Sequence, residues 1–337
     1  MANDFNTPFQ FNEEADLEIS LRPKNFSDFV GQAELLEHLE ISVKAAKERN
    51  ENLDHILLYG PPGLGKTTLA YIMANELGVN IHTTTGPAME RKKDIAAILS
   101  NLEEKDILFI DEIHRLNRSV EETLYPAMED YALDIIIGQG PSAKTLRLDI
   151  PKFTLIGATT RAGMLTSPLR DRFGIINRID FYDPEDLARI VERDAHVLNI
   201  RVEHEAALEI SKRSRGTPRI AIRILKRIRD YAQIKGDGTV KLDITLTALE
   251  KLNIDKMGLD EIDKRLLRLI IEKYAGGPVG IETLAIALSE AKETIEDIYE
   301  PYLIQTGFLK RTRNGRVATD FAKEYLGYPA DGSGALF

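Results

Sequence analysis

Residues 55–77 read HILLYGPPGLGKTTLAYIMANEL, an apolar run, a loop rich in glycine and proline, and a run with helical character. The loop, Gly60-Pro-Pro-Gly-Leu-Gly-Lys66-Thr67, satisfies the pattern G-x-x-x-x-G-K-[ST] in full. Its glycines let backbone N–H groups turn inward around phosphate oxygens, and the helix start that follows adds a favourable dipole. The pattern therefore predicts a nucleoside triphosphate site. A plain glycine turn between strand and helix is the alternative, and the spacing and context disfavour it.

Side chains of the same loop have separate predicted tasks. Lys66 supplies a point charge for the β- and γ-phosphates, and the Thr67 hydroxyl is a ligand for Mg²⁺. The full set of predicted ATP contacts in the loop is Gly63, Gly65, Lys66, Thr67 and Thr68.

A second candidate element is the apolar run of residues 106–116, DILFIDEIHRL, which ends in two carboxylates. Asp111 is expected to hold the water shell of Mg²⁺, and Glu112 to polarise the attacking water as a general base. A solvated acidic strand end is the alternative, and a complete phosphate loop upstream makes it the weaker one. The letters DEIH also suggest a DExH helicase, but the GPPGLGKT loop argues against that class.

Short apolar runs alternate with helical patterns as far as about residue 182. They lie at residues 55–60, 79–84, 106–111, 153–159 and 176–182. Strands separated by helices indicate an α/β fold with a parallel sheet, and nearly continuous apolar character is typical of strands covered on both faces. We therefore predict a P-loop α/β domain over residues 1–182, with a poorly ordered polar and acidic segment at residues 1–16.

Asp183-Pro184 ends this alternation. Apolar residues recur three and four apart over residues 183–254, which predicts a small helical domain. Residues 255–337 show three helical patterns followed by FLKRTRNGRVAT, in which Asn314-Gly315 is a strong hairpin signal. Three helices and a β-hairpin are the pattern of a winged helix.

Composition limits the remaining possibilities. The absence of Cys rules out disulfides and Cys-based zinc sites, and the six His lack the spacing of a helical metal pair. Neither a signal peptide nor a membrane-spanning stretch is evident, so a cytoplasmic location is expected. The formal net charge of −10 argues against a surface covered in nucleic acid.

One stretch departs from this acidic background. Residues 301–319 contain no Asp or Glu but include Lys310, Arg311, Arg313 and Arg316. On the wing of a winged helix these side chains would contact backbone phosphates, which position a protein on DNA without reading its sequence. We predict Arg311 and Arg316 as DNA contacts. The alternative is a basic surface hairpin with no ligand.

Several stretches make the sequence similar to AAA+ ATPases and, within that class, to the RuvB family. They are LRPKNFSDFVGQ (residues 21–32), GPPGLGKTTLA (60–70), FIDEIHRLN (109–117), IGATTRAG (156–163), LTSPLRDRFG (165–174) and RGTPRIA (215–221). The resemblance covers about residues 18–328. It implies a large ATPase domain, a helical lid and a winged helix, and a hexameric ring that drives branch migration of Holliday junctions.

The resemblance also implies residue roles. Thr160 matches sensor 1, although a strand-end Thr chosen for β propensity competes with that interpretation. Arg172 matches an arginine finger that acts in trans, and the preference for it over Arg170 rests on the resemblance alone. Arg219 matches sensor 2. Further implied nucleotide contacts are Leu21, Arg22, Glu129, Asp130, Tyr131 and Tyr182.

Residues 132–150 interrupt the α/β alternation with two β-rich arms around GQGPS. The resemblance implies that this hairpin docks RuvA, the junction-binding partner, with the nuclease RuvC as a neighbour in the assembly. Ile135, Ile136, Ile137, Leu146, Leu148 and Ile150 supply its apolar character. One face of the hairpin could instead pack on its own domain.

Two other functions are compatible with the same motifs. A clamp-loader-like AAA+ switch shares the phosphate loop, sensors and finger, and a basic winged helix favours a translocase over it. A DNA-binding regulator with an ATP-controlled oligomeric state predicts sequence-specific binding.

Overall fold

The computed structural model describes residues 21–137 and 144–329, and its contacts divide the chain into two compact units. The first comprises residues up to 60 together with 64–180, and the second comprises residues 61–63 and those from 181 onward. The predicted disorder of residues 1–16 falls outside the described residues.

The first unit contains a five-stranded sheet whose strand pairs are all parallel, as predicted. Its order is β2 (Ile81–Thr85), β3 (Ile107–Asp111), β6 (Thr154–Thr159), β1 (Ile56–Tyr59) and β7 (Ile175–Arg178). The three central strands are almost wholly buried, whereas β2 and β7 alternate between half-buried and exposed residues. The prediction that every strand is covered on both faces is therefore wrong for these two, because each lies at an edge of the sheet.

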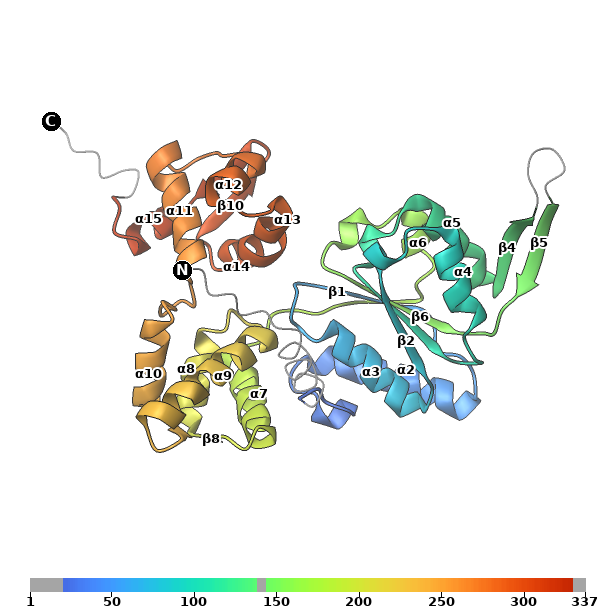
Figure 1. Ribbon diagram of the computed structural model, residues 1–337, viewed down its shortest axis with the longest axis horizontal. Helices are drawn as coiled ribbons and strands as arrows, with labels where there is room; N and C mark the ends of the chain where they lie inside the picture. Colours follow the sequence, from blue (N-terminus) through green and yellow to red (C-terminus); the bar gives the residue numbers. More distant parts are fainter. Residues whose placement is uncertain (1–20, 138–143, 330–337) are drawn as a thin grey trace. The chain divides into compact units, whose positions relative to one another are not determined.

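Helices cover both faces of this sheet. Helices α2 (Ala33–Arg49) and α3 (Lys66–Leu77) lie together on one face, and α4 (Lys92–Ser100) and α5 (Arg118–Glu129) lie on the other (Figure 1). The core under α4 and α5 joins Ile95, Leu99 and Leu124 to Leu57 and Leu155 of the central strands. The short helix α6 (Ser167–Arg170) follows β6.

A two-stranded antiparallel hairpin, β4 (Ala132–Ile137) and β5 (Lys144–Asp149), extends from this unit as predicted (Figure 1). Leu133 and Ile150 at its base are buried in the domain core.

The second unit begins with four helices, α7 (Pro184–Val197), α8 (His204–Lys212), α9 (Pro218–Lys235) and α10 (Leu242–Lys251). Asp183 caps α7 by accepting a hydrogen bond from the Asp186 backbone N–H, and Pro184 occupies the first turn, where its missing N–H costs nothing. A small parallel pair, β8 (Arg201–Val202) with β9 (Thr239–Val240), was not predicted, since two residues per strand carry no periodicity.

The rest of the unit is a winged helix. It contains α11 (Glu261–Tyr274), α12 (Ile281–Leu288), α13 (Lys292–Thr294), a π-helical segment (Ile295–Tyr299), α14 (Glu300–Gln305), the hairpin β10 (Leu309–Thr312) and β11 (Gly315–Ala318), and α15 (Asp320–Tyr325). The third predicted helix is therefore divided. Pro301 lacks the N–H that would continue the α-helical hydrogen bonds, which accounts for the break before α14.

Candidate functional site

The loop between β1 and α3 has the backbone shape of a phosphate-binding loop. Gly60 has φ 150° and Gly65 has φ 100°, both in the region that favours glycine. A Cβ on Gly60 would lie 2.3 Å from the Ile179 carbonyl oxygen, so a larger residue does not fit there. Gly65 directly precedes α3, and the loop therefore runs into a helix N-terminus, whose N–H groups attract phosphate.

Lys66 is the first residue of α3, and its side chain is buried. Its Nζ donates to the Gly60 carbonyl oxygen at 2.7 Å, which holds the ammonium group across the loop. Thr67 and Thr68 follow in the first turn and are half-buried. Lys66, predicted for the phosphates, and Thr67, predicted for Mg²⁺, thus lie in the same helix start.

Asp111 and Glu112 lie at the carboxyl end of β3, on the same edge of the sheet as the loop. Between β3 and β1 runs β6, and the Gly60 N–H donates to the Thr159 carbonyl oxygen at 3.1 Å. Parallel strands end at one edge, so Gly60, Asp111 and Thr159 mark three neighbouring strand ends, where α/β folds bind their ligands. Asp111 Oδ1 accepts a hydrogen bond from the Glu112 backbone N–H at 2.9 Å.

Thr160 directly follows β6, next to a contact that the sequence analysis did not single out. Oγ1 of the buried Thr159 lies 2.9 Å from His114 Nδ1 and accepts a hydrogen bond from the Arg161 backbone N–H. This contact joins the segment after Asp111 and Glu112 to the segment that carries Thr160. The histidine of DEIH was the only sequence signal for it.

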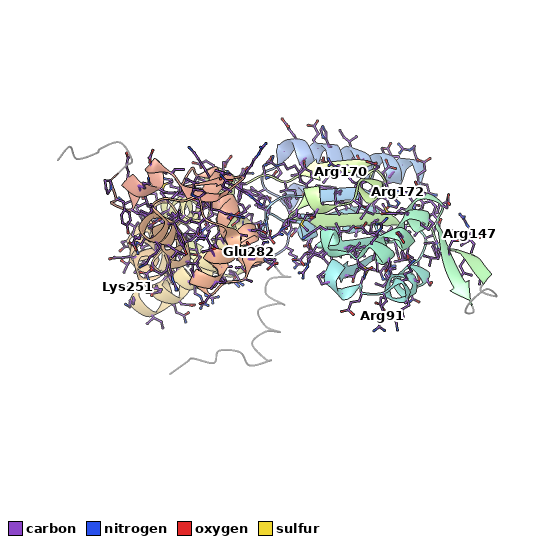
Figure 2. The ribbon with its side chains drawn as sticks, turned by 90° about the horizontal axis from the view of Figure 1, so that it is seen from above. Arg91, Arg147, Arg170, Arg172, Lys251 and Glu282 are labelled. Carbon is purple, nitrogen blue, oxygen red and sulfur yellow. The ribbon has the colours of Figure 1, made fainter. Side chains whose placement is uncertain are left out.

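Arg172 follows α6 and has three contacts within the first unit. Its guanidinium lies 4.4 Å from the centre of the Tyr125 ring, pairs with Glu129 Oε2 at 3.0 Å and donates to the Pro168 carbonyl oxygen at 2.6 Å. Arg170 is exposed and lies on α6, close to Arg172 (Figure 2). The structure thus orients Arg172, the predicted finger.

The other predicted contacts near Glu129 lie at the corner between α5 and the hairpin. Asp130 pairs with Arg147 of β5 at 2.7 Å, at the base of the hairpin arm (Figure 2). Tyr131 packs edge-on against Phe153. On β5, Leu146 is 44% exposed and Leu148 is 38% exposed. The base of the hairpin packs on its own domain, while apolar side chains farther out on β5 face solvent. The side chains of Ile135, Ile136 and Ile137 and the GQGPS tip lie outside the described residues.

Leu21 and Arg22 lie at the start of the described chain. Leu21 is buried, and the Arg22 guanidinium lies 5.5 Å from the centre of the Tyr71 ring on α3. Both predicted nucleotide contacts therefore belong to the unit that contains Lys66 and α3, and Arg22 lies beside α3.

Tyr182 and Arg219 belong to the second unit and flank one turn of the helical domain. The Tyr182 N–H donates to the Gly216 carbonyl oxygen at 2.9 Å, and burial raises the pKa of the Tyr182 hydroxyl. Arg219 lies in the first turn of α9. Gly63, which groups with this unit, accepts a hydrogen bond from the Arg219 N–H at 3.4 Å.

The two predicted DNA contacts on the wing differ sharply in environment. The Arg311 side chain is 60% exposed, whereas that of Arg316 is 8% exposed and bonded to Glu300 and to Glu296 at 2.9 Å. The prediction that Arg316 contacts a phosphate does not fit this position, because its guanidinium is already neutralised inside the domain. Lys310, Arg311 and Arg313 are exposed, so the wing still carries a basic surface.

Three family models match consecutive parts of the chain. They are the Holliday junction DNA helicase RuvB P-loop domain over residues 21–179, the RuvB AAA lid domain over 182–255 and the RuvB C-terminal winged helix domain over 256–327. The chain belongs to the RuvB family. The solved structure of the Thermotoga maritima RuvB Holliday junction branch migration motor is 52% identical, with a TM-score of 0.84 over 92% of this chain and 99% of that one. Two point mutants of that RuvB give a TM-score of 0.85, at 51% and 52% identity over 91% of this chain, and cover 98% and 99% of their own.

In residues 21–137 and 144–329, no group of three or more acidic, His or Cys side chains is arranged to hold a metal ion. A magnesium ion bound through a nucleotide needs fewer protein ligands, and the oxygens of Thr67 and Asp111 are of the hard type that it prefers. Among the same residues, no helix is long and apolar enough to cross a membrane.

Proposed function

We propose that this chain is the ATP-driven motor of the RuvAB complex, which moves Holliday junctions by branch migration. Membership of the RuvB family along nearly all of its length carries the proposal. A phosphate loop beside strand-end carboxylates supports ATP as the substrate that is hydrolysed. An exposed basic wing supports duplex DNA as the molecule along which the protein moves. We propose that the protein acts in the cytoplasm.

For hydrolysis, Glu112 would act as the general base. It would take a proton from a water whose oxygen bonds to the γ-phosphorus while the bond to the β–γ bridging oxygen breaks, releasing ADP and phosphate. The Glu112–Arg115 pair, 2.9 Å long, is exposed and weak, so the carboxylate is able to turn toward that water. Lys66 and the loop N–H groups would hold the β- and γ-phosphates, and Thr160 would orient the water.

The Thr67 hydroxyl and the Asp111 carboxylate are the residues that would hold Mg²⁺. Packing of α3 against β3 supports this pairing, because each helix or strand carries one of the two ligands. Bound Mg²⁺ neutralises phosphate charge during transfer.

Arg172 would complete the ATP site of the neighbouring subunit in a homohexameric ring. An arginine finger stabilises the charge that develops on the transferred phosphoryl group. Because Glu129 pairs with Arg172, the same surface carries both residues, and the contacts predicted for Glu129, Asp130 and Tyr131 would then reach the neighbour's nucleotide. Arg219 would sense the γ-phosphate of its own subunit's ATP. Tyr182, whose backbone N–H bonds to Gly216 in the turn before α9, would contact the same nucleotide.

Surface chemistry supports the other proposed partners. Lys310, Arg311 and Arg313 would contact duplex phosphates independently of sequence, as translocation along any DNA requires. The exposed apolar side chains of β5 would dock RuvA, because a soluble protein rarely leaves an apolar patch uncovered unless a partner covers it. RuvC would join through the larger assembly.

Branch migration on a synthetic four-way junction, with and without ATP and RuvA, tests the proposal. We expect ATP-dependent conversion of the junction into two duplexes, accelerated by RuvA. Nucleotide-dependent binding without junction movement would favour a clamp-loader-like switch. A footprint restricted to one sequence would favour a DNA-binding regulator.

A further inference from the structure

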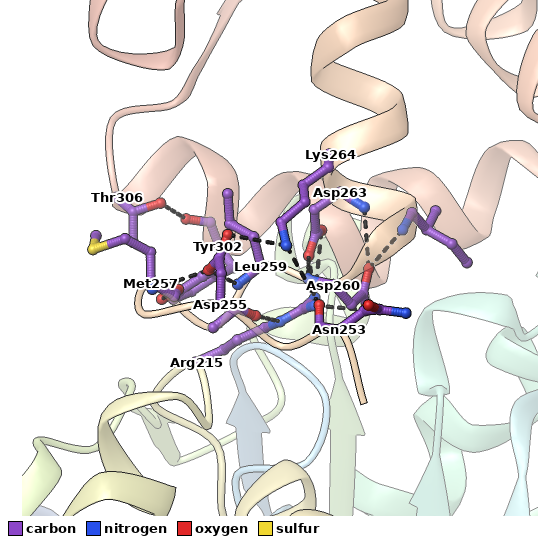
Figure 3. Close-up of polar contacts among 12 residues, drawn as sticks. Arg215, Asn253, Asp255, Met257, Leu259, Asp260, Asp263, Lys264, Tyr302 and Thr306 are labelled. Carbon is purple, nitrogen blue, oxygen red and sulfur yellow. Dashed lines mark hydrogen bonds and ion pairs between the residues drawn. The ribbon is translucent and has the colours of Figure 1, made fainter. Parts of the chain in front are cut away.

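A buried ion cluster joins the helical lid (residues 183–254) to the winged helix (residues 255–329) within the second unit (Figure 3). The Arg215 guanidinium pairs with Asp260 at 2.6 Å and with Asp263 at 2.5 Å, and its Nε donates to the Gly258 carbonyl oxygen at 2.9 Å. Arg215 is 7% exposed and Asp263 is fully buried. One lid side chain thus binds three groups of the winged-helix segment.

The chain between the two domains is also closely held. Asp255 Oδ1 accepts hydrogen bonds from the Met257 and Leu259 backbone N–H groups, and the Tyr302 hydroxyl donates to the Met257 carbonyl oxygen at 2.6 Å (Figure 3). A Cβ on Gly258 would lie 2.7 Å from the Arg213 carbonyl oxygen, so the linker backbone packs directly on the lid. Several polar contacts therefore hold the connection between the lid and the winged helix, which is not a flexible linker. We call this connection, formed by Arg215, Gly258, Asp260 and Asp263, the Arg215 joint.

The lid side of this joint leads directly to the predicted nucleotide contacts. Arg215 has φ 53°, a left-handed conformation that a non-glycine residue adopts only when its surroundings impose it. Gly216, the next residue, accepts the hydrogen bond from Tyr182, and α9 with Arg219 begins two residues later. A shift of Arg215 therefore moves the turn that positions both Tyr182 and Arg219.

Stability alone gives little reason for this arrangement. Burying ions costs desolvation energy, and replacing a buried ion cluster by apolar residues of similar volume is often neutral or stabilising. An arginine fork held by three acceptors does, however, fix an orientation that apolar contacts leave adjustable.

We propose that Arg215 is a positioning residue through which the winged helix sets the orientation of Arg219, so that DNA bound by the winged helix controls ATP hydrolysis. The inference rests on the sensor role proposed for Arg219. It adds that DNA stimulates hydrolysis through the Arg215 joint.

Two conservative variants test the joint in the full chain. Arg215→Lys keeps the charge but replaces the planar fork by one compact ammonium group, which cannot span the separate acceptors that the Arg215 nitrogens bind. Asp260→Asn removes one ion pair and keeps the oxygen that caps α11 through the Ile262 and Asp263 N–H groups. Arg189→Lys, in the exposed pair with Asp186 on α7, is the matched control.

The readouts are ATP affinity, duplex affinity, and ATPase rate with and without a long duplex. For both joint variants we expect both affinities and the DNA-free rate to stay within about twofold of wild type, and the stimulation by DNA to fall at least tenfold. The control should behave like wild type. Normal stimulation in Asp260→Asn and Arg215→Lys would overturn the proposal, as would equal losses of affinity and rate, which indicate a merely structural role. If the wild-type protein itself shows no stimulation by DNA, the proposed function fails, and this inference with it.

Discussion

Glu112 occupies a left-handed backbone conformation with φ 48°, directly after the last residue of β3. A residue with a Cβ adopts this region at a cost of roughly 1–2 kcal/mol, and such strain concentrates at functional positions. The turn also brings the Glu112 carbonyl oxygen so close to Gly86 that a Cβ there would lie 2.4 Å away. This strained turn thus lies directly after Asp111, at the residue that we propose as the general base.

Replacing Glu112 by Gln removes the proposed base and keeps the shape of the side chain. We expect ATP affinity to remain near wild type and steady-state turnover to fall by ~10²–10⁴-fold, the usual contribution of general base catalysis. Glu122→Gln is the matched control, since Glu122 is similarly exposed and also pairs with an arginine one turn away. Turnover near wild type in Glu112→Gln would show that another group activates the water.

Arg311 and Arg316 show how two similar residues on one hairpin acquire different tasks. Arg311→Ala should weaken duplex binding equally for unrelated sequences and reduce the log-affinity against log-salt slope by about 0.9, the value per phosphate contact. Salt titrations on two unrelated duplexes measure this. An unchanged slope would show that Arg311 does not contact a DNA phosphate.

Arg316→Ala should act on the fold instead. It removes the close partner of the buried Glu300, whose next cation, Arg311, lies 3.9 Å away, and breaking a buried pair costs roughly 3–5 kcal/mol. We expect a lower temperature of unfolding for the winged helix. Arg316→Ala with wild-type stability and a reduced salt slope would restore Arg316 as a phosphate contact.

Among the elements, the β4–β5 hairpin combines a packed base with an exposed arm. Leu133 and Ile150 are buried in the domain core, while Leu146 on β5 faces solvent. The two interpretations of the hairpin therefore apply to different parts of it. Its base packs in the ATPase domain, and the exposed side chains of Leu146 and Leu148 on β5 are where we propose that a partner docks.

Leu146→Ser should weaken binding to RuvA, because it removes an apolar contact from the proposed docking arm. ATPase activity without RuvA should stay unchanged, since Leu146 is 44% exposed. Leu246→Ser on α10, where Leu246 is 42% exposed, is the control for a general loss of apolar surface. Calorimetric titration with RuvA measures the affinity of the wild type and of both variants. Equal affinity for the wild type and Leu146→Ser would place the docking surface elsewhere.

At the scale of the whole molecule, we propose that the catalytic groups are divided between surfaces that serve different subunits. Lys66 and Glu112 follow strand ends of the sheet, whereas Arg172 is held by Tyr125 and Glu129 at the end of α6. A ring is needed if this finger is to complete a site.

Mixing two inactive variants tests that division. Lys66→Ala should lose ATP binding, and Arg172→Ala should bind ATP but hydrolyse it at least 10³-fold more slowly, the usual contribution of a finger. In mixed rings, an intact site beside an intact finger should recover part of the turnover. Arg170→Ala serves as the control and should remain active. Mixed rings without recovery would assign Arg172 a role within its own subunit.

The features that could be predicted from sequence are those encoded in consecutive residues. The phosphate loop is eight adjacent positions whose glycines have no substitute, and Asp111 and Glu112 end an apolar run that has to be a buried strand. The parallel sheet, the helical lid and the winged helix follow from periodicity in the same way.

Charge pairing was decided by the tertiary structure. The wing stretch contains no acid, yet the fold brings Glu296 and Glu300 against Arg316 and removes it from solvent. Arg215 pairs with Asp263, which lies 48 positions later in the sequence, and no motif around either residue predicts this pair. Local sequence specifies backbone shape through short-range sterics and hydrogen bonds, whereas a long charged side chain takes its role from whichever partner the folded chain places within a few ångströms of it.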